Sequence, residues 1–126
     1  MTEQLSILYV DDEPDIRLIV QMALNLHPSL STRTAASGEE ALDMVIGEGW
    51  RPHLIMVDVM MPGLTGPEVL AVLLANPDTA EIPVVFVTAR ARPPDIDAYI
   101  AQGARAVIVK PFDPMSLATQ VISLAS

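Results

Sequence analysis

The stretch ILYVDDEPDIRLIVQMAL, residues 7–24, decides the fold class, because it joins a short apolar run to a segment with helical periodicity. Residues 7–10 lack the two-residue alternation of a strand with one wet face, which predicts a strand covered on both faces, as in a parallel sheet. After Pro14, apolar side chains recur every three or four residues up to Leu24, which predicts a helix ending near His27. The stretch therefore contains one strand followed by one helix.

The same unit recurs along the rest of the chain. Further apolar runs predict buried strands at residues 54–57, 84–87 and 106–109, and a less regular segment predicts an edge strand at residues 31–35. A capping box at residues 37–40 and prolines near helix starts predict the remaining helices, which begin at Ser37, Gly66, Pro93 and Asp113. Regular alternation of strand and helix predicts an α/β fold with a doubly wound, five-stranded parallel sheet and right-handed crossovers.

Length and composition narrow the class of protein. The 126 residues fit one domain, and we expect a single domain over residues 1–126 with no output domain. Sixteen acidic against seven basic residues give a charge of −9, so we expect no direct binding to nucleic acid. The chain has no cysteine, no apolar run long enough to span a bilayer and no basic start of a signal peptide, so we expect a cytoplasmic protein without membrane insertion.

Polar side chains stand where the predicted strands end. Asp11 and Asp12 follow the first strand, Asp58 the third, Thr88 the fourth, and Lys110, the only lysine in the chain, the fifth. Each residue alone has an ordinary explanation, such as a helix cap, a turn residue or a solvated strand end. In a doubly wound sheet, however, the carboxyl ends of the strands form one edge, and ligands bind there. The joint placement therefore predicts a functional site.

The chemistry of these side chains suits phosphoryl transfer. Neighbouring carboxylates do not all ionise readily without a cation, and a site of hard oxygen ligands suits Mg²⁺. Asp58 would be the nucleophile and form an aspartyl phosphate. The metal and Lys110 would offset the added negative charge, and Thr88 would donate a hydrogen bond to a phosphoryl oxygen.

Four blocks of the sequence resemble a known family. In order and spacing, the chain is similar to the receiver domains of bacterial two-component response regulators, in particular single-domain chemotaxis regulators, over the blocks ILYVDDEPDIR (7–17), HLIMVDVMMPGLTG (53–66), IPVVFVTA (82–89) and GARAVIVKPF (103–112). The resemblance implies a flavodoxin-like (βα)₅ sheet with strand order 2-1-3-4-5. It also implies that the site is a phosphorylation site.

Roles for individual residues follow from the resemblance. Asp58 corresponds to the phosphorylated aspartate, and Asp11 and Asp12 to the acidic pair that holds Mg²⁺. Met60 corresponds to the residue whose backbone carbonyl also coordinates the metal. Thr88 corresponds to the switch hydroxyl and Lys110 to the lysine that contacts the phosphate. The peptide bond between Lys110 and Pro111 is commonly cis in the family.

The resemblance further implies a signalling phosphoacceptor and not an enzyme, with only self-phosphorylation and self-dephosphorylation of its own. Asp58 would take its phosphoryl group from a histidine kinase or a histidine phosphotransfer protein, and the result would be a change in binding to an unknown downstream protein. We expect a monomer or a weak homodimer. The face that often docks partners in the family would include Tyr99, Arg105, Val107 and Phe112.

Two positions depart from the family. Val107 stands where receivers usually carry tyrosine or phenylalanine, so the signal should leave the site by another route than an aromatic swing at this position. Thr65 stands where the family often has aspartate, and we expect little effect there, in a loop. Arg90, two residues after Thr88, either reaches the phosphoryl group or is simply solvated.

Three other functions can be weighed against the receiver. A phosphatase with an aspartate nucleophile needs a second aspartate two residues later as general acid, and Met60 cannot transfer a proton. A flavin carrier needs a phosphate-binding loop after the first strand, where Asp11 and Asp12 would repel phosphate. A degenerate receiver that binds partners without phosphorylation remains the alternative, with Val107 as its main support.

Overall fold

A computed structural model describes residues 4–125, which fold around a five-stranded parallel sheet of order β2-β1-β3-β4-β5. The strands are β1 (Leu5–Val10), β2 (Leu30–Ala35), β3 (Leu54–Asp58), β4 (Val84–Thr88) and β5 (Ala106–Val109). The predicted fold class and strand order are confirmed. Since the strands are parallel, their carboxyl ends lie at one edge of the sheet.

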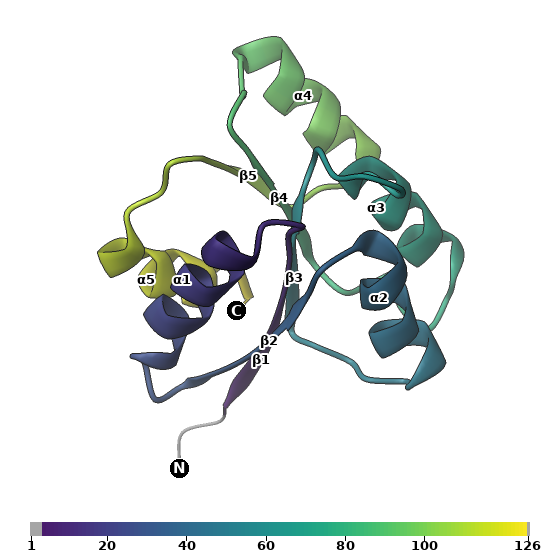
Figure 1. The fold of residues 1–126 in the computed structure, drawn as a ribbon. Helices are drawn as coiled ribbons and strands as arrows, with labels where there is room; N and C mark the ends of the chain where they lie inside the picture. Colours follow the sequence, from purple (N-terminus) through teal and green to yellow (C-terminus); the bar gives the residue numbers. More distant parts are fainter. Residues whose placement is uncertain (1–3, 126) are drawn as a thin grey trace.

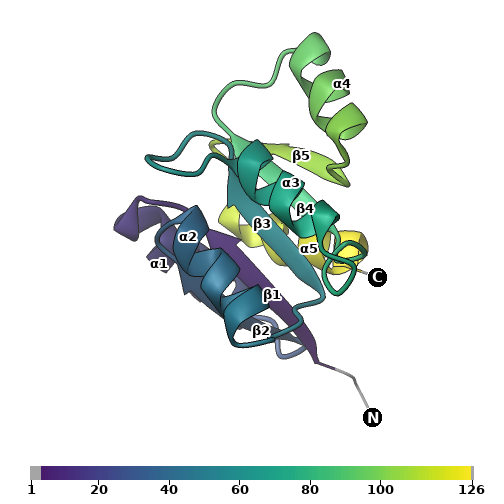
Figure 2. The ribbon, with the colours of Figure 1, turned by 90° about the vertical axis from the view of Figure 1, so that its right-hand side faces the viewer.

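Helices cover both faces of this sheet. They are α1 (Pro14–Asn25), α2 (Gly38–Leu42) with a π-helical continuation η1 (Asp43–Gly47), α3 (Gly66–Ala75), α4 (Pro93–Gln102) and α5 (Pro114–Ala125). Figure 1 shows α1 and α5 on one side of the strands and α2, α3 and α4 on the other. Figure 2, turned by 90°, shows α2 and α3 lying along the near face of the sheet.

Two hydrophobic clusters hold these layers together. One packs the side chains of the sheet that face α2 and α3, and includes Leu8, Val57 and Phe86. The other packs the opposite face of the sheet against α1 and α5, and includes Tyr9 and Leu117. The strands in the middle of the sheet, β1, β3 and β4, are therefore buried on both faces, which explains their unbroken apolar sequence.

Strand β5 differs from the prediction of a fully covered strand. Val107 is half-buried and Val109 is 46% exposed. The reason is its place in the sheet: β5 is an edge strand, and α4 on one side of it has no fully buried residue. An apolar run alone does not distinguish an edge strand from a central one.

The helix starts also refine the predictions. The predicted capping box at residues 37–40 forms only in part: the Ser37 side chain accepts a hydrogen bond from the N–H of Glu40, but the Glu40 carboxylate binds the N–H of Ala36 instead of that of Ser37. Thr65, predicted to be an ordinary loop residue, is the N-cap of α3 and forms a full capping box with Glu68. Threonine supplies the same side-chain acceptor at an N-cap as aspartate.

Within residues 4–125, none of the helices combines the length and the apolar character needed to cross a membrane.

Candidate functional site

The carboxyl edge of the sheet brings together the polar side chains that follow its strands. Asp11 comes directly after β1 and is fully buried, Asp58 is the last residue of β3 and is 7% exposed, and Thr88 ends β4 and is 5% exposed. The parallel registers of β1 with β3 and of β3 with β4 hold these strand ends side by side. Lys110 follows β5 and reaches across the same edge.

Lys110 joins the two buried carboxylates. Its Nζ lies 2.9 Å from Asp11 Oδ2 and 2.9 Å from Asp58 Oδ2. Burial lowers the pKa of the Lys110 ammonium, but the hydrogen bonds and negative charges of Asp11 and Asp58 outweigh burial, so that its pKa is raised overall. The side chain is therefore a fixed positive charge between two acids. The peptide bond from Lys110 to Pro111 is cis, as the family resemblance implied.

Asp58 is held at both carboxylate oxygens. Its Oδ1 accepts a hydrogen bond of 3.1 Å from the backbone N–H of Met60, and its Oδ2 accepts the bond from Lys110. Burial raises the pKa of the Asp58 carboxyl, and Lys110 opposes this rise without cancelling it. The folded protein thus holds Asp58 where burial disfavours the ionised carboxylate, which is typical of functional carboxylates.

Two residues that the sequence did not single out fix Asp11. The hydroxyl of Tyr9 donates a hydrogen bond of 2.8 Å to Asp11 Oδ2, and Arg17 Nη1 donates one of 2.8 Å to the Asp11 carbonyl oxygen. Burial, and then the charge of Asp11, raise the pKa of Tyr9, so that the phenol stays a hydrogen-bond donor. A signal existed for Tyr9, because it lies two residues before Asp11 and so on the same face of the strand.

Three carboxylates at this edge fit a metal ion. Asp11, Asp12 and Asp58 each offer an oxygen, and these oxygens all lie within 4.8 Å of one another. Asp11 and Asp58 are buried, whereas Asp12 is exposed. Hard oxygen ligands with one open side suit a divalent cation that keeps several waters. The residues present can therefore hold a divalent metal ion.

A cavity of about 600 Å³ lies above Asp58. Thr88 and Arg90 line it, and the Thr88 hydroxyl donates to the carbonyl oxygen of Arg90 and accepts from its N–H. Tyr99 of α4 lines it as well, with its ring edge-to-face against Phe86 at a centroid distance of 5.2 Å. The sequence predicts Tyr99 only on the docking face, whereas in the structure Tyr99 also lines the cavity above Asp58.

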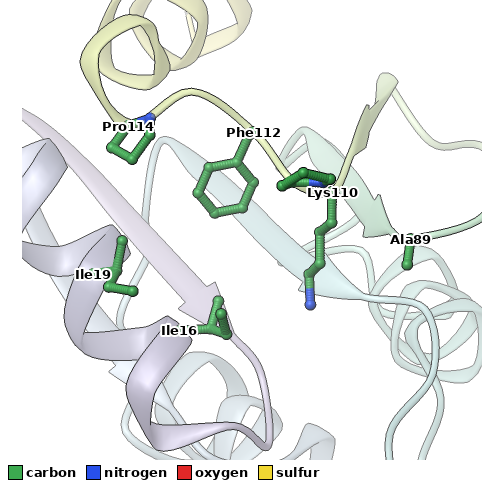
Figure 3. A pocket seen from close by; sticks show the side chains of 7 residues that line it. Ile16, Ile19, Ala89, Lys110, Phe112 and Pro114 are labelled. Carbon is green, nitrogen blue, oxygen red and sulfur yellow. The ribbon is translucent and has the colours of Figure 1, made fainter.

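A second cavity, of about 320 Å³, adjoins the first. Ile16 and Ile19 of α1 lie on one side of it, and Phe112 and Pro114 from the segment after β5 lie on the other (Figure 3). Lys110 borders both cavities. Phe112 therefore packs toward α1 and belongs to the hydrophobic cluster on the other face of the sheet from Tyr99.

The fold and this arrangement agree with the comparison to known families. A family model described as "Response regulator receiver domain" matches residues 7–122. The chain belongs to this family. Receiver domains are signalling phosphoacceptors of two-component systems, and the acidic pocket of this one suits a metal ion.

Known receivers resemble the chain along nearly its whole length. It is 36% identical over 124 residues to the response regulator Rre1 of Synechocystis, which covers 98% of this chain and 53% of that protein. Chemotaxis response regulator CheY4 of Vibrio cholerae has 30% identity and a TM-score of 0.86, with 96% of this chain and 98% of that chain covered. The Mn²⁺-bound form of response regulator Rcp1 has 26% identity and a TM-score of 0.78, with 95% of this chain and 91% of that chain covered. The chain spans about half the length of the first curated relatives it matches.

The receiver domain also has the predicted departure at Val107. Val107 pairs with Phe86 in the register of β4 and β5, so both side chains point to the same face of the sheet, under α4. Tyr99 packs on this face too. The aromatic ring next to the site therefore comes from α4 and not from β5.

Proposed function

We propose that this receiver domain accepts a phosphoryl group on Asp58 and thereby changes its binding to a downstream protein. The observation that supports this proposal best is the joint contact of Lys110 with Asp11 and Asp58, at 2.9 Å each. A lysine in a buried acidic pocket offsets the negative charge that a phosphoryl group would bring. The degenerate receiver, which binds partners without chemistry, gives no reason for this arrangement.

In the proposed transfer, a carboxylate oxygen of Asp58 forms a bond to phosphorus while the bond from phosphorus to the donor atom breaks. The donor atom is an imidazole nitrogen of a histidine kinase or phosphotransfer protein, or an oxygen of a small acyl phosphate, and it keeps the bonding electron pair. Later attack of water on phosphorus would release inorganic phosphate, a proton and the free carboxylate. Lys110 favours the ionised form of Asp58 that the first step needs.

The metal in this proposal is Mg²⁺. Asp11, Asp12 and Asp58 would hold it, together with the backbone carbonyl of Met60. Bound Mg²⁺ would supply positive charge at the phosphoryl oxygens. The Mn²⁺ bound to Rcp1 supports a divalent cation in a receiver of this fold.

The Thr88 hydroxyl would move to donate a hydrogen bond to the phosphoryl group on Asp58. This hydroxyl now bonds to the carbonyl of Arg90, in the loop between β4 and α4. To donate to a phosphoryl oxygen on Asp58, the hydroxyl has to leave that carbonyl, which frees the loop to move. The loop and α4 would therefore carry the signal toward a partner.

We propose that the phosphodonor protein docks on α1. Several apolar side chains stay exposed there and at the start of α5, namely Leu18 (58%), Ile19 (45%), Met22 (62%), Leu26 (75%) and Met115 (81%). This surface continues into the cavity between α1 and Phe112, which Lys110 also borders (Figure 3). A helix lying on this surface would hold its histidine near Asp58.

The mass of the intact protein after incubation with acetyl phosphate tests the chemistry. We expect a gain of one phosphoryl group that requires Mg²⁺ and is absent in Asp58→Asn. The matched control Asp78→Asn removes an exposed carboxylate from the turn after α3 and should be modified like the wild type. No gain in folded wild-type protein would overturn the proposal in favour of the degenerate receiver.

The docking surface is tested by comparing two donors. Met22→Glu should slow transfer from a phosphorylated histidine phosphotransfer domain but leave modification by acetyl phosphate unchanged, because the small donor needs no docking. Equal rates with the protein donor for Met22→Glu and the wild type would exclude this face.

A further inference from the structure

The loop between β3 and α3, residues 59–65, connects the site to a distant part of the chain. It begins at the phosphoacceptor, where the N–H of Met60 donates to Asp58 Oδ1. It ends at α3, where the N–H of Gly66 donates to the carbonyl of Val59 at 3.1 Å. Together with Lys110, this loop therefore sets the orientation of the Asp58 carboxylate, and it sets the position of the Met60 carbonyl.

Glu39 of α2 holds the end of this loop that adjoins α3. Its Oε1 accepts a hydrogen bond of 2.9 Å from the N–H of Leu64, which is 25 residues further along the chain. Within residues 4–125, this is the hydrogen bond that connects the loop segment from Met60 to Leu64 with α2. This bond is the main cause of the lowered pKa of Glu39, which favours the carboxylate as the acceptor.

Close packing around two glycines gives this contact little freedom. A Cβ on Gly63, which has φ +74°, would lie 2.7 Å from Glu39 Oε1. A Cβ on Gly38 would lie 2.9 Å from the Cβ of Leu64. The start of α2 and the loop thus approach each other more closely than side chains on these glycines would permit.

We propose that Glu39 is a positioning residue for the metal site, acting through the loop on Met60 and Asp58. This inference rests on the proposed role of Asp11, Asp12, Asp58 and Met60 in metal binding. Glu39 does not itself touch these groups; it fixes the backbone that carries one ligand and orients another. Outer contacts that orient metal ligands commonly change affinity when they are lost.

The neighbouring Glu40 provides a matched control. It lies on the same helix, carries the same charge, is exposed like Glu39 and also accepts a hydrogen bond from a backbone N–H, that of Ala36 at 3.0 Å. Its partner lies outside the β3–α3 loop. Glu39→Ala and Glu40→Ala therefore each remove one negative charge and one hydrogen bond to a backbone N–H, but only the first releases the loop.

Binding of Mn²⁺, followed by the electron paramagnetic resonance signal of the free ion without any phosphodonor, tests the proposal. We expect Glu39→Ala to raise the Kd for Mn²⁺ about threefold to tenfold, which is less than the roughly 10–100-fold typical when a group bound directly to a ligand is removed. Glu40→Ala should change the Kd by less than about twofold. Glu39→Gln, which keeps an oxygen acceptor without the charge, should stay close to the wild type.

Three results would overturn the proposal. If Glu39→Ala and Glu40→Ala raised the Kd for Mn²⁺ equally, only the net charge would matter. If Glu39→Gln raised the Kd as much as Glu39→Ala, the hydrogen bond to Leu64 would not matter. A wild-type protein that binds no Mn²⁺ would remove the metal site on which the inference rests. Mn²⁺ binding without phosphorylation by acetyl phosphate would instead contradict the proposed function and leave the role of Glu39 standing.

Discussion

Replacing Lys110 by methionine tests whether charge in the acidic pocket holds the fold together. Methionine keeps most of the aliphatic stem that lines the cavity toward α1 but removes the ammonium between Asp11 and Asp58. The two buried carboxylates then face each other without a cation. Burial already raises the pKa of Asp58, so its charge should become harder to keep in the folded state.

The expected loss follows from the burial of the three groups. Removing one partner of a buried ion pair typically destabilises a protein by about 3–5 kcal/mol. The Lys110 side chain is 16% exposed and borders two cavities, so water can reach the pocket. The loss of stability should therefore lie at the lower end of this range. We expect a loss of about 3 kcal/mol at pH 7 without divalent metal, or a fall in Tm of roughly 10 °C for a domain of this size.

Metal and protons should both reduce this loss. Mg²⁺ at about 100 times its Kd stabilises the folded state by roughly 2.7 kcal/mol. At one fixed concentration, Mg²⁺ should stabilise the more negative variant more than the wild type, because the extra negative charge should lower the Kd. An acid whose pKa is raised by folding binds protons more tightly in the folded state, so the variant should regain stability as the pH falls through the raised pKa of Asp58.

Urea denaturation at pH 7 and pH 4, with and without Mg²⁺, measures these effects. Arg105→Met, which removes an exposed positive charge at the start of β5, is the control and should change stability by no more than about 0.5 kcal/mol. A loss below about 1 kcal/mol in Lys110→Met, or a loss that neither pH nor Mg²⁺ alters, would refute the charge argument.

Three further substitutions have outcomes that the structure predicts. Asp58→Asn should stabilise the protein above the raised pKa of Asp58 by about 0.5–2 kcal/mol, since it removes a buried charge that folding disfavours; the difference in denaturation midpoint should vanish at low pH. Gly66→Ala should destabilise by about 1–3 kcal/mol in thermal unfolding, because its Cβ would lie 2.8 Å from the Asp58 carbonyl oxygen and 3.1 Å from Val59 Cα. Tyr99→Leu should lose the edge-to-face contact with Phe86, which is worth about 0.5–1.5 kcal/mol. Relative to the wild type, this variant should show faster amide hydrogen exchange in α4 but not in α5.

The fold and the list of residues at the strand ends were predictable from the sequence. Apolar runs without alternation mark strands that are buried on both faces, and such strands are parallel and end at one edge. That edge is where Asp11, Asp58 and Lys110 meet. Local patterns suffice here, because the topology of a doubly wound sheet converts chain positions into spatial neighbours.

Contacts that depend on packing between distant elements were not predictable. Glu39 looks like an ordinary residue of a first helical turn, and its bond to Leu64 follows from how closely α2 approaches the loop after β3. Tyr99 follows the period of its helix, but which side chain it meets depends on the placement of α4 over Phe86. The exposure of β5 depends likewise on its place at the edge of the sheet.

The single lysine has a consequence for amine chemistry. Acylating reagents attack neutral amines, and apart from the terminal amine this chain offers them only the ε-amine of Lys110. Its bonds to Asp11 and Asp58 and its raised pKa keep that amine protonated and occupied. Acylation of the lysine should therefore be slow in the folded protein, and a substitution that removes the carboxylate of Asp11 or Asp58 should speed it. The rate of acylation at this single lysine thus reports on whether the acidic pocket is intact.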